Sequence, residues 1–488
     1  MKRIIIILLI VSFTELLYSQ NYLSSTNGYY IDGLKTSENF YTSTARSTAM
    51  GGAFTSLGGD LGGISVNPAG IGVFRSSEIS FSPGFSAVNT SSNYLGTKST
   101  GINYNYNLGN FGAVFNFKNN NDEGWSNFNI AFGENKLNNF NYNYSIEGTT
   151  NNSSLTNVFL TNSYNQDGSA KSPANLDPYS SMLAFDAYVI DTANGKYFSP
   201  YSKVNLKQEQ LISMSGSMNE YYFGFGANYN HQLYIGATLN IRSGEYNEEY
   251  DLTETDINKV SYLDYYRYST SINTNANGFN LKIGAIYKPV DFLRLGLSLQ
   301  TPTVMHVDQA SSNKIISVRS DGNIYDVPSV GYSESYSITT PFRANAGVAL
   351  ILQQYGLLSF DYEYVDYRSI NLSNNSNGYD FTADNDAISK GLKATNNLRA
   401  GGELRLGSVF IRGGYAYYAS PYASSEYNKD ANSTIYSGGI GFRNNNFVLD
   451  FSYSYLTRDE KYPMYAGASL ANLSSNTSNF MATFGFKF

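Results

Sequence analysis

The chain ends in the run NFMATFGFKF, Asn479 to Phe488, and this run decides the fold. Its apolar side chains recur with the two-residue period of a β-strand, at Phe480, Ala482, Phe484, Phe486 and Phe488. The opposite face carries Thr483, Gly485 and Lys487, with Met481 as an exception. A soluble edge strand with these exposed Phe rings would aggregate, and lipid removes that penalty. The run therefore predicts a lipid-facing strand of a transmembrane β-barrel.

The same alternation recurs upstream. Phe447–Tyr455 alternates in this way and is joined to Tyr436–Phe442 by the short turn Arg443–Asn446. Four further hairpins are predicted: Leu398–Leu406 with Val409–Tyr418, Arg343–Leu352 with Leu357–Tyr367, Gly278–Tyr287 with Phe292–Gln300, and Tyr221–Tyr229 with Leu233–Ile241. Long polar insertions separate these hairpins: Gly148–Gln210, Gly244–Tyr262, Val304–Tyr332 and Ser369–Lys393. Short turns at one end and long loops at the other are typical of outer-membrane barrels, whereas a soluble sandwich would not sort its loops in this way.

Counting the strands gives about sixteen. Eleven lie in the hairpins and the C-terminal run, and five precede them: Glu78–Phe85, Gly101–Asn107, Phe111–Phe117, Asn127–Gly133 and Phe140–Ser145. An even number is expected when both ends of the barrel lie on the periplasmic side.

The composition narrows the class of protein further. The chain has 44 Tyr, 30 Phe and 44 Gly but only 15% charged residues, against about 25% in ordinary globular domains. The mean hydropathy of -0.31 fits a barrel, because lipid-facing and lumen-facing side chains offset each other. The absence of Cys and the presence of only two His, His231 and His306, argue against metal, cofactor and thiol chemistry. A net charge of -7 argues against nucleic acid as a partner. No enzyme activity is expected.

The first nineteen residues have the pattern of a signal peptide. Lys2 and Arg3 precede the apolar run Ile4–Phe13, and Ser19 stands where a signal peptidase would cut before Gln20. The alternative, a membrane anchor, would need about twenty apolar residues. Residues 1–19 are therefore predicted to direct export.

Residues 20–76 alternate poorly and are rich in glycine, as in Met50-Gly51-Gly52-Ala53-Phe54 and Leu61-Gly62-Gly63. Glycine permits positive φ and close backbone approach, which a small plug inside a lumen would need. A phosphate loop is excluded because no Lys-Ser/Thr pair follows Gly51-Gly52. Three segments are predicted: signal peptide 1–19, N-terminal hatch 20–76 and barrel 77–488.

A resemblance to a known family rests on these N-terminal residues. Arg46, Met50–Phe54, Asp60 and Asn67–Gly70 resemble the N-terminal signature of FadL-type outer-membrane transporters of long-chain fatty acids and other hydrophobic compounds. Weaker similarities follow at Tyr287–Pro289, Leu293–Leu297, Leu398–Leu406 and Ile411–Tyr415. The chain looks similar to the subgroup labelled hemin receptor.

The resemblance implies a barrel of fourteen strands, a hatch in the lumen and a ligand that leaves sideways through a gap in the wall. Met50, Gly51, Gly52, Asn67, Pro68, Ala69 and Gly70 would form the hatch and gate motif, with Asn67, Pro68 and Ala69 facing the lateral opening. The alternative is that Asn67-Pro68 only makes a turn before the first strand. The kinked third strand of the family would correspond to Phe111–Asn119. Phe484, Phe486 and Phe488 resemble the terminal signal that the barrel-assembly machinery recognises.

These observations predict an all-β transmembrane antiparallel barrel of fourteen strands, with sixteen as the alternative, located in a bacterial outer membrane as a monomer. Its predicted function is passive transport of long-chain fatty acids or other hydrophobic small molecules, with hemin as a further candidate ligand. The expected partners are this ligand, outer-membrane lipid and the barrel-assembly machinery. A structural or adhesive barrel and a general porin are the alternatives. Residues 20–76 are too few for the plug of an energy-coupled receptor.

Overall fold

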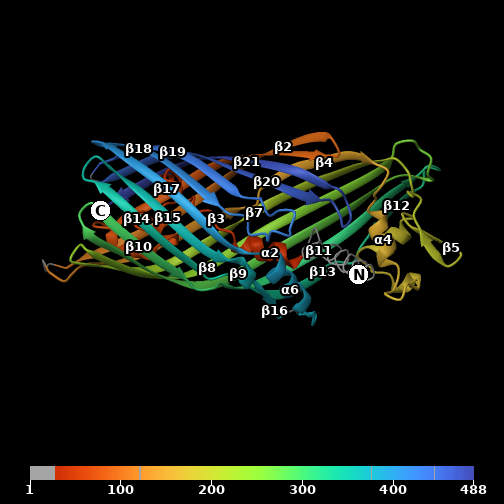
Figure 1. The fold of residues 1–488 in the computed structure, drawn as a ribbon, viewed down its shortest axis with the longest axis horizontal. Helices are drawn as coiled ribbons and strands as arrows, with labels where there is room; N and C mark the ends of the chain where they lie inside the picture. Colours follow the sequence, from red (N-terminus) through yellow and green to blue (C-terminus); the bar gives the residue numbers. More distant parts are fainter. Residues whose placement is uncertain (1–27, 120–122, 375, 445) are drawn as a thin grey trace, which may run out of the picture.

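The computed structural model of the chain is a long antiparallel β-barrel (Figure 1). It describes residues 28–119, 123–374, 376–444 and 446–488, so the predicted signal peptide 1–19 and the first residues of the predicted hatch lie outside the described residues. No helix in the described part of the chain is long and apolar enough to cross a membrane.

The described residues form a closed barrel of fourteen strand positions, here called staves, in agreement with the predicted fold. A stave is one strand, or two consecutive strands that continue one another along the wall. The barrel closes where β1 pairs with β21, with Glu78 opposite Lys487. The staves, in chain order, are β1 (Glu78–Tyr94), β2 (Thr97–Lys118), β3 (Trp125–Asn139) continued by β4 (Tyr142–Thr150), β7 (Leu206–Tyr229), β8 (Leu233–Asp256), β9 (Leu263–Val290), β10 (Leu293–Gln300) continued by β11 (Val304–Arg319), β13 (Tyr332–Thr339) continued by β14 (Arg343–Leu352), β15 (Gly356–Asp366), β17 (Ala394–Leu406), β18 (Val409–Tyr418), β19 (Ser433–Arg443), β20 (Phe447–Pro463) and β21 (Leu470–Lys487).

The count of sixteen strands was wrong for two local reasons. Gly101–Asn107 and Phe111–Phe117 are parts of one strand, β2, in which Gly109 is a bulge opposite the register shift at Ser82 and Pro83. A bulge reverses the alternation of faces and so looks like a turn in the sequence. Asn127–Gly133 and Phe140–Ser145 belong to β3 and β4, which follow one another along the same neighbour, β7.

Much of the predicted loop sequence is also strand. β7, β8 and β9 are 24, 24 and 28 residues long, and Gly244–Asp256 extends β8 instead of forming a loop. The outward side chains of β8 are apolar at Ile235, Leu239 and Ile241 and polar beyond them, at Ser243, Glu245 and Asn247. Alternation of polarity ends where the strand leaves lipid, because both faces are then in contact with water or polar groups.

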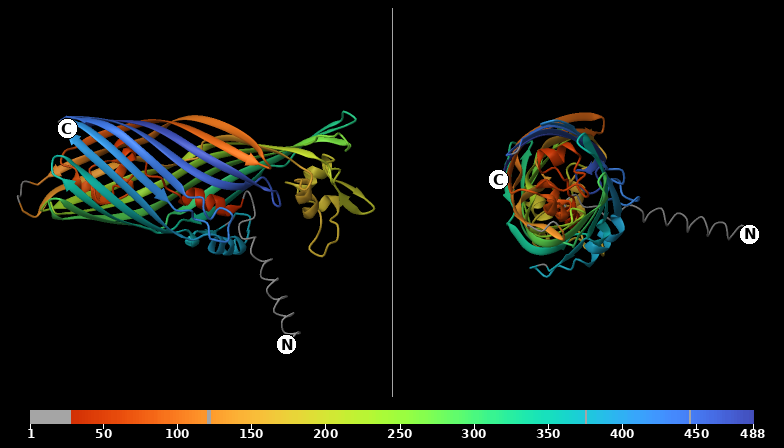
Figure 2. Two further views of the ribbon diagram at one scale, coloured as in Figure 1. Left: turned by 45° about the horizontal axis from the view of Figure 1, so that its top comes forward. Right: turned by 90° about the vertical axis from the view of Figure 1, so that its left-hand side faces the viewer.

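The two ends of the barrel differ (Figure 2). The C-terminus and the short hairpin turns lie at one end, here called the turn end. At the other end, the loop end, residues 151–205 form a small cap, and short elements extend the wall. These elements are α4 (Thr156–Asn162), η4 (Pro173–Asn175), α5 (Ser181–Asp186), β5 (Asp191–Ala193) and β6 (Lys196–Phe198) in the cap, and β12 (Ile324–Pro328), η5 (Tyr367–Ser369), β16 (Asn371–Ser373) and α6 (Thr382–Gly391) elsewhere.

The described hatch residues, 28–76, lie inside the barrel (Figure 2, right). They form α2 (Tyr29–Ser37), α3 (Ala45–Ala49), η2 (Gly62–Ser65) and η3 (Pro68–Val73). A capping box between Thr44 and Ser47 begins α3, and Asn67 caps η3. The side chains of α3, η2 and most of η3 are buried against the wall.

Candidate functional site

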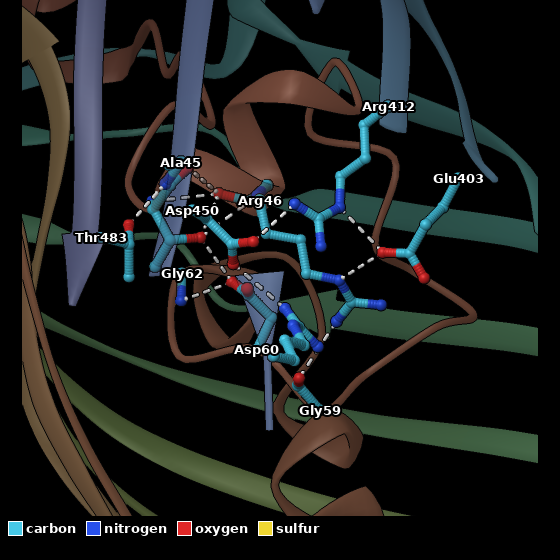
Figure 3. Close-up of polar contacts among 12 residues, drawn as sticks. Ala45, Arg46, Gly59, Asp60, Gly62, Glu403, Arg412, Asp450 and Thr483 are labelled. Carbon is cyan, nitrogen blue, oxygen red and sulfur yellow. Dashed lines mark hydrogen bonds and ion pairs between the residues drawn. The ribbon is translucent and has the colours of Figure 1, made fainter. Parts of the chain in front are cut away.

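A network of ion pairs fastens the hatch to the wall near the turn end (Figure 3). The Arg46 Nε of α3 lies 3.1 Å from the Glu403 carboxylate of β17, and Arg412 Nε of β18 donates to the same oxygen at 2.8 Å. Arg412 also pairs with Asp450 of β20 at 2.7 Å. Removing one partner from such a buried network would cost about 3–5 kcal/mol, because the remaining charge would be left without compensation.

Asp60, which belongs to the same N-terminal motif as Arg46, makes its contacts within the hatch (Figure 3). Its Oδ1 accepts hydrogen bonds from Thr44 Oγ1 at 2.7 Å and from the amides of Gly62 and Gly63 at 3.0 and 3.2 Å. The Ala45 amide at the start of α3 donates to Thr483 Oγ1 of β21 at 2.7 Å. Asp60 therefore shapes the hatch itself, whereas Arg46 and Ala45 attach it to the barrel.

Side chains of the wall, from β3 to β14, hold the hatch by donating hydrogen bonds to the backbone carbonyls of the hatch. Polar side chains of the wall donate to carbonyl oxygens of hatch residues, most of which lie at the ends of helical segments or outside them. The donor and acceptor pairs are Asn129 to Ile71, Arg242 to Thr36, Lys282 to Ser65, Arg294 to Leu57, Ser298 to Val66 and Arg343 to Ser37. The hatch is therefore attached on nearly every side.

The two parts of the predicted gate motif, Met50–Gly52 and Asn67–Gly70, contact different parts of the barrel wall. Gly51 and Gly52 have φ of 62° and 72°, and a Cβ on Gly51 would meet the Tyr415 carbonyl at 2.8 Å. Gly51 and Gly52 thus form a left-handed turn after Met50 that is pressed against β17 and β18. Asn67 accepts from the Ala69 amide at 3.0 Å and donates to the carbonyls of Thr55 and Ala285 at 2.6 and 3.3 Å.

Pro68, Ala69 and Gly70 begin η3, which packs against β7, β8 and β9, with a close contact between the Pro68 carbonyl and Gly236. Asn67 therefore caps a helix as well as preceding Pro68, and the motif packs away from the cavity described below. Its role as a gate stays a prediction.

The Phe484, Phe486 and Phe488 rings are exposed on the outside of the wall, and their role in assembly also stays a prediction.

The wall has a seam between β2 and β3. β2 pairs with β3 only from Asn110 to Lys118, so among the described residues the part at 97–109 is paired with β1 alone. β3 ends at Asn139, and β4 resumes pairing with β7 at Tyr142. β4 then packs against β1, where Ser92 Oγ donates to the Ser145 carbonyl at 2.7 Å, and against β2, where Asn143 and Tyr144 lie beside Gly101. We call the gap between 97–109 of β2 and residues 136–141, at and just beyond the end of β3, the seam.

The predicted position of the kink was wrong. Phe111–Lys118, within the predicted segment Phe111–Asn119, is a regular part of β2 and is paired with β3 throughout. The wall breaks instead at Phe140 and Asn141, between β3 and β4. The extra strands of the sequence-based count explain this error of position, and lateral exit through a gap in the wall stays a prediction.

Hatch residues 38–43, here called the seam segment, occupy the inner side of this gap. The Phe40 amide donates to the Leu137 carbonyl of β3 at 2.8 Å, and Ser43 Oγ donates to the Lys136 carbonyl at 3.3 Å. A Cβ on Gly109 of β2 would clash with the Ser43 carbonyl. The seam segment therefore contacts both sides of the gap.

A cavity of about 310 Å³ lies beside the seam segment. Aromatic and aliphatic side chains from α2, β1, β4 and β20 line it, together with Ser, Asn and charged residues. Its lining includes both faces of β3: Leu137 is buried in the lumen, whereas Lys136 lies opposite Asn219 on the face that carries exposed Tyr221. The cavity therefore extends from the lumen into the seam.

Ion pairs tie α2 across this cavity. Arg458 of β20 holds Glu38, the residue that follows α2, with Nη1 at 3.0 and 3.3 Å from the two carboxylate oxygens, and its Nε lies 2.6 Å from Glu460. Lys35 of α2 pairs with Glu248 of β8 at 2.5 Å. All five side chains line the cavity.

A second cavity, of about 200 Å³, lies nearer the turn end along the same wall. Its lining is mostly polar and includes Asp60, Arg75, Glu78, Arg443 and Lys487. Both cavities border β1, β20 and β21, and α3 packs on this wall between them through Ala45 and Thr48, which contact Thr483 and Met481.

These features define a class: a plugged transmembrane-type barrel with an internal amphipathic cavity that reaches a seam in the wall. Solved structures share the fold at low sequence identity. The CymD monoaromatic hydrocarbon channel is 14% identical, with a TM-score of 0.51 over 92% of this chain and 99% of its own. The Pseudomonas putida toluene transporter TodX is 13% identical, with a TM-score of 0.54 over 91% and 98%. A Pseudomonas aeruginosa FadL homologue is 12% identical, with a TM-score of 0.55 over the same shares.

No protein-family model matches the chain, and no curated protein matches it in sequence. The likeness of fold agrees with the sequence resemblance to FadL-type transporters of hydrophobic compounds. Membership of the subgroup labelled hemin receptor stays a prediction.

Sequence reasoning singled out Arg46 and Asp60 as part of a motif without their partners, and it missed the seam segment and the Glu38–Arg458 pair. The pair joins residues 420 positions apart, and neither belongs to a motif. The one available signal was that Arg458 and Glu460 place charges in an otherwise regular strand.

Proposed function

We propose that the chain is a passive outer-membrane transporter of hydrophobic small molecules, long-chain fatty acids among them. The observation that supports this proposal is the cavity that extends from the plugged lumen into the seam. A ligand would enter from the loop end, occupy the cavity and leave sideways into lipid through the seam. Hemin as a ligand stays a prediction.

The driving force for capture needs no catalytic group. Burying each methylene group is worth about 0.8 kcal/mol, so the apolar lining can take up an acyl chain or an aromatic ring from water. Release into the bilayer is favoured because lipid offers an equally apolar environment. The ligand then follows its gradient without an energy source.

A cross-link across the seam tests this route. Because the chain has no Cys, Asn107→Cys and Asn138→Cys, one on each side of the seam, can be bridged by a short bis-maleimide. The control pair Asn89→Cys and Asn476→Cys joins neighbours on β1 and β21, where the wall is continuous. Uptake of a labelled fatty acid into proteoliposomes should stop with the first bridge and continue with the second.

The alternatives predict other outcomes. If the seam bridge leaves uptake unchanged while filling of the second cavity abolishes it, the ligand crosses towards the turn end and lateral exit is wrong. If neither fatty acid nor aromatic hydrocarbon is taken up by the unmodified protein, an adhesive or structural barrel becomes the better interpretation.

A further inference from the structure

The barrel wall is taller on one side than on the other (Figure 2, left). β7, β8 and β9 have 24, 24 and 28 residues, whereas β15, β18 and β19 have 11, 10 and 11. The extra length lies towards the loop end, beyond the lipid-facing part of the wall. We call the outward side of this extension, on β7, β8, β9 and β11, the tall face.

The tall face begins at a sharp boundary with the lipid-facing wall. The last apolar row crosses the four neighbouring strands in register, and its side chains are all exposed: Tyr221, Ile241, Phe279 and Val304. The next row towards the loop end is polar throughout: Asn219, Ser243, Asn277 and His306. A lipid whose acyl chains rest on the apolar row therefore has its headgroup against the tall face.

Asn and Ser make up most of the tall face. The three rows that follow are Ser217, Glu245, Asn275 and Asp308, then Ser215, Asn247, Asn273 and Ala310, then Ser213, Glu249, Ser271 and Ser312. None of the residues described in these first four rows is a Lys or Arg, and the first outward cation is Lys314 in the fifth row. Arg and Lys are the side chains that bind phosphate groups, so these rows do not suit a phosphate headgroup.

Some of these side chains are held in place by one another. Asn273 Nδ2 donates to Asn247 Oδ1, and Asn275 Nδ2 donates to Asn273 Oδ1 at 3.3 Å. An Asn amide has two donor hydrogens and an oxygen with two lone pairs, so each keeps further bonding capacity towards the outside. Strands about 4.8 Å apart and rows about 7 Å apart give the four rows an area of about 14 by 20 Å, enough for several sugar rings.

We propose that the tall face binds the sugar headgroups of glycolipids in the outer leaflet of the same membrane. Its Asn and Ser side chains exchange hydrogen bonds with sugar hydroxyls, which are neutral and both donate and accept. The acyl chains of the same lipid lie on the apolar row, so the lipid contact and the sugar contact are continuous. The carboxylates Glu245, Glu249 and Asp308 repel phosphate and so favour a neutral headgroup. This inference depends on location in an outer membrane and not on transport.

The first measurement is binding of lipids to the purified protein in an uncharged detergent, followed by native mass spectrometry. The probes are digalactosyl diacylglycerol, which has a neutral disaccharide headgroup, and phosphatidylglycerol with the same acyl chains. The galactolipid should stay bound at detergent concentrations that remove the phospholipid. Free digalactose should bind far more weakly than the galactolipid, because it lacks the contact with the apolar row.

The second measurement removes three neighbouring amides of the tall face. In a variant that combines Asn247→Ala, Asn273→Ala and Asn275→Ala, affinity for the galactolipid should fall by about tenfold or more, because the hydrogen bonds of three side chains are lost. Affinity for phosphatidylglycerol should not change. The matched control replaces three exposed Asn residues of the cap by Ala, at Asn152, Asn157 and Asn175, and should bind both lipids as the unmodified protein does. Heat-modifiability shows that both variants are folded.

Three outcomes would overturn the inference. Equal retention of the two lipids, with no loss in the tall-face variant, would show that only the acyl chains bind. Tighter retention of phosphatidylglycerol that a chelator abolishes would show divalent cations bridging the carboxylates to phosphate. Binding of free digalactose as tight as that of the galactolipid would make a soluble glycan the partner. None of these outcomes bears on the proposed transport, which the cross-link across the seam tests separately.

Discussion

Asn67 shows how much a single buried side chain contributes to the hatch. Its oxygen caps η3 at the Ala69 amide, and its nitrogen bonds to the Thr55 carbonyl within the hatch and the Ala285 carbonyl of the wall. One amide thus joins two hatch turns to β9. Neither Ser nor Asp can replace it, because the arrangement uses one acceptor and two donors, whereas Ser has a single donor and ionised Asp has none.

Replacing Asn67 should therefore loosen the hatch locally. Asn67→Ala should destabilise docking of η3 by about 1–3 kcal/mol, since a cap is lost and buried carbonyls are left unpaired. Asn67→Asp keeps the cap but turns an oxygen towards two carbonyl oxygens, so it should be the more damaging change. Hydrogen exchange at the Ala69 amide measures this, with heat-modifiability as the control for the barrel. Equal protection in Asn67→Asp and the unmodified protein would contradict the assignment.

Glu254 holds the cap, residues 151–205, to the loop end of the barrel, beyond the lipid-facing part of the wall. It lies near the loop-end tip of β8 and accepts hydrogen bonds from Ser154 Oγ, the Leu155 amide, Gln208 Nε2 and Tyr266 OH. Burial raises the pKa of Glu254 above its usual range, although these hydrogen bonds lower it in part. The carboxyl is therefore more easily protonated when the cap is docked than when it is undocked.

It follows that docking of the cap should be pH-dependent. An acid with a raised pKa in the folded state favours folding at low pH, and the contribution is lost as the pH rises from the unfolded value through the raised value. Protease cleavage within 151–205 should thus be slower at mildly acidic than at neutral pH. Glu254→Gln should abolish this dependence, because the hydroxyl groups of Ser154 and Tyr266 can accept from its amide. Faster cleavage under acidic conditions would contradict the prediction.

The strands show what the sequence could and could not reveal. Phe447–Tyr455 and Phe480–Phe488 alternate because one face meets lipid and the other the polar lumen, so both strands were predicted. The part of β8 nearest the loop end was not predicted as strand, because its outward side chains, such as Glu245 and Asn247, are as polar as the lumenal ones. The position of the seam could not be predicted, because it depends on which strand pairs with β2 and not on the pattern within any strand.

Among the elements, β21 carries a prediction about assembly. Phe486 and Phe488 face lipid with similar exposure, 61% and 63%, so replacing either by Ser removes a similar apolar contact. If the terminal residue is the one recognised during assembly, Phe488→Ser should lower the amount of heat-modifiable barrel in the outer membrane several-fold more than Phe486→Ser, with export unaffected. Equal losses in the two variants would show that the terminal aromatic acts only through lipid contact.

The whole molecule combines a wide barrel with a small plug. Fourteen strands enclose a lumen that wall side chains alone do not fill, and here hatch residues and their hydrogen-bonding partners occupy it. The buried cations Arg242, Lys282 and Arg343 would face water if the hatch left. Attachment on nearly every side explains how so small a hatch can close the lumen.

Removing the hatch should therefore turn the protein into an open pore. A variant without residues 28–76 should conduct steadily in a planar bilayer, whereas the intact protein should conduct poorly, because α3, η2 and η3 fill the cross-section with buried side chains. Glu403→Gln should be intermediate: it leaves Arg46 and Arg412 without their shared carboxylate, at a cost of about 3–5 kcal/mol, and should give brief openings. Glu245→Gln, on the outside of the wall, should leave the trace unchanged. Free conduction by the intact protein, with no change on removal of the hatch, would make an ordinary porin the better interpretation.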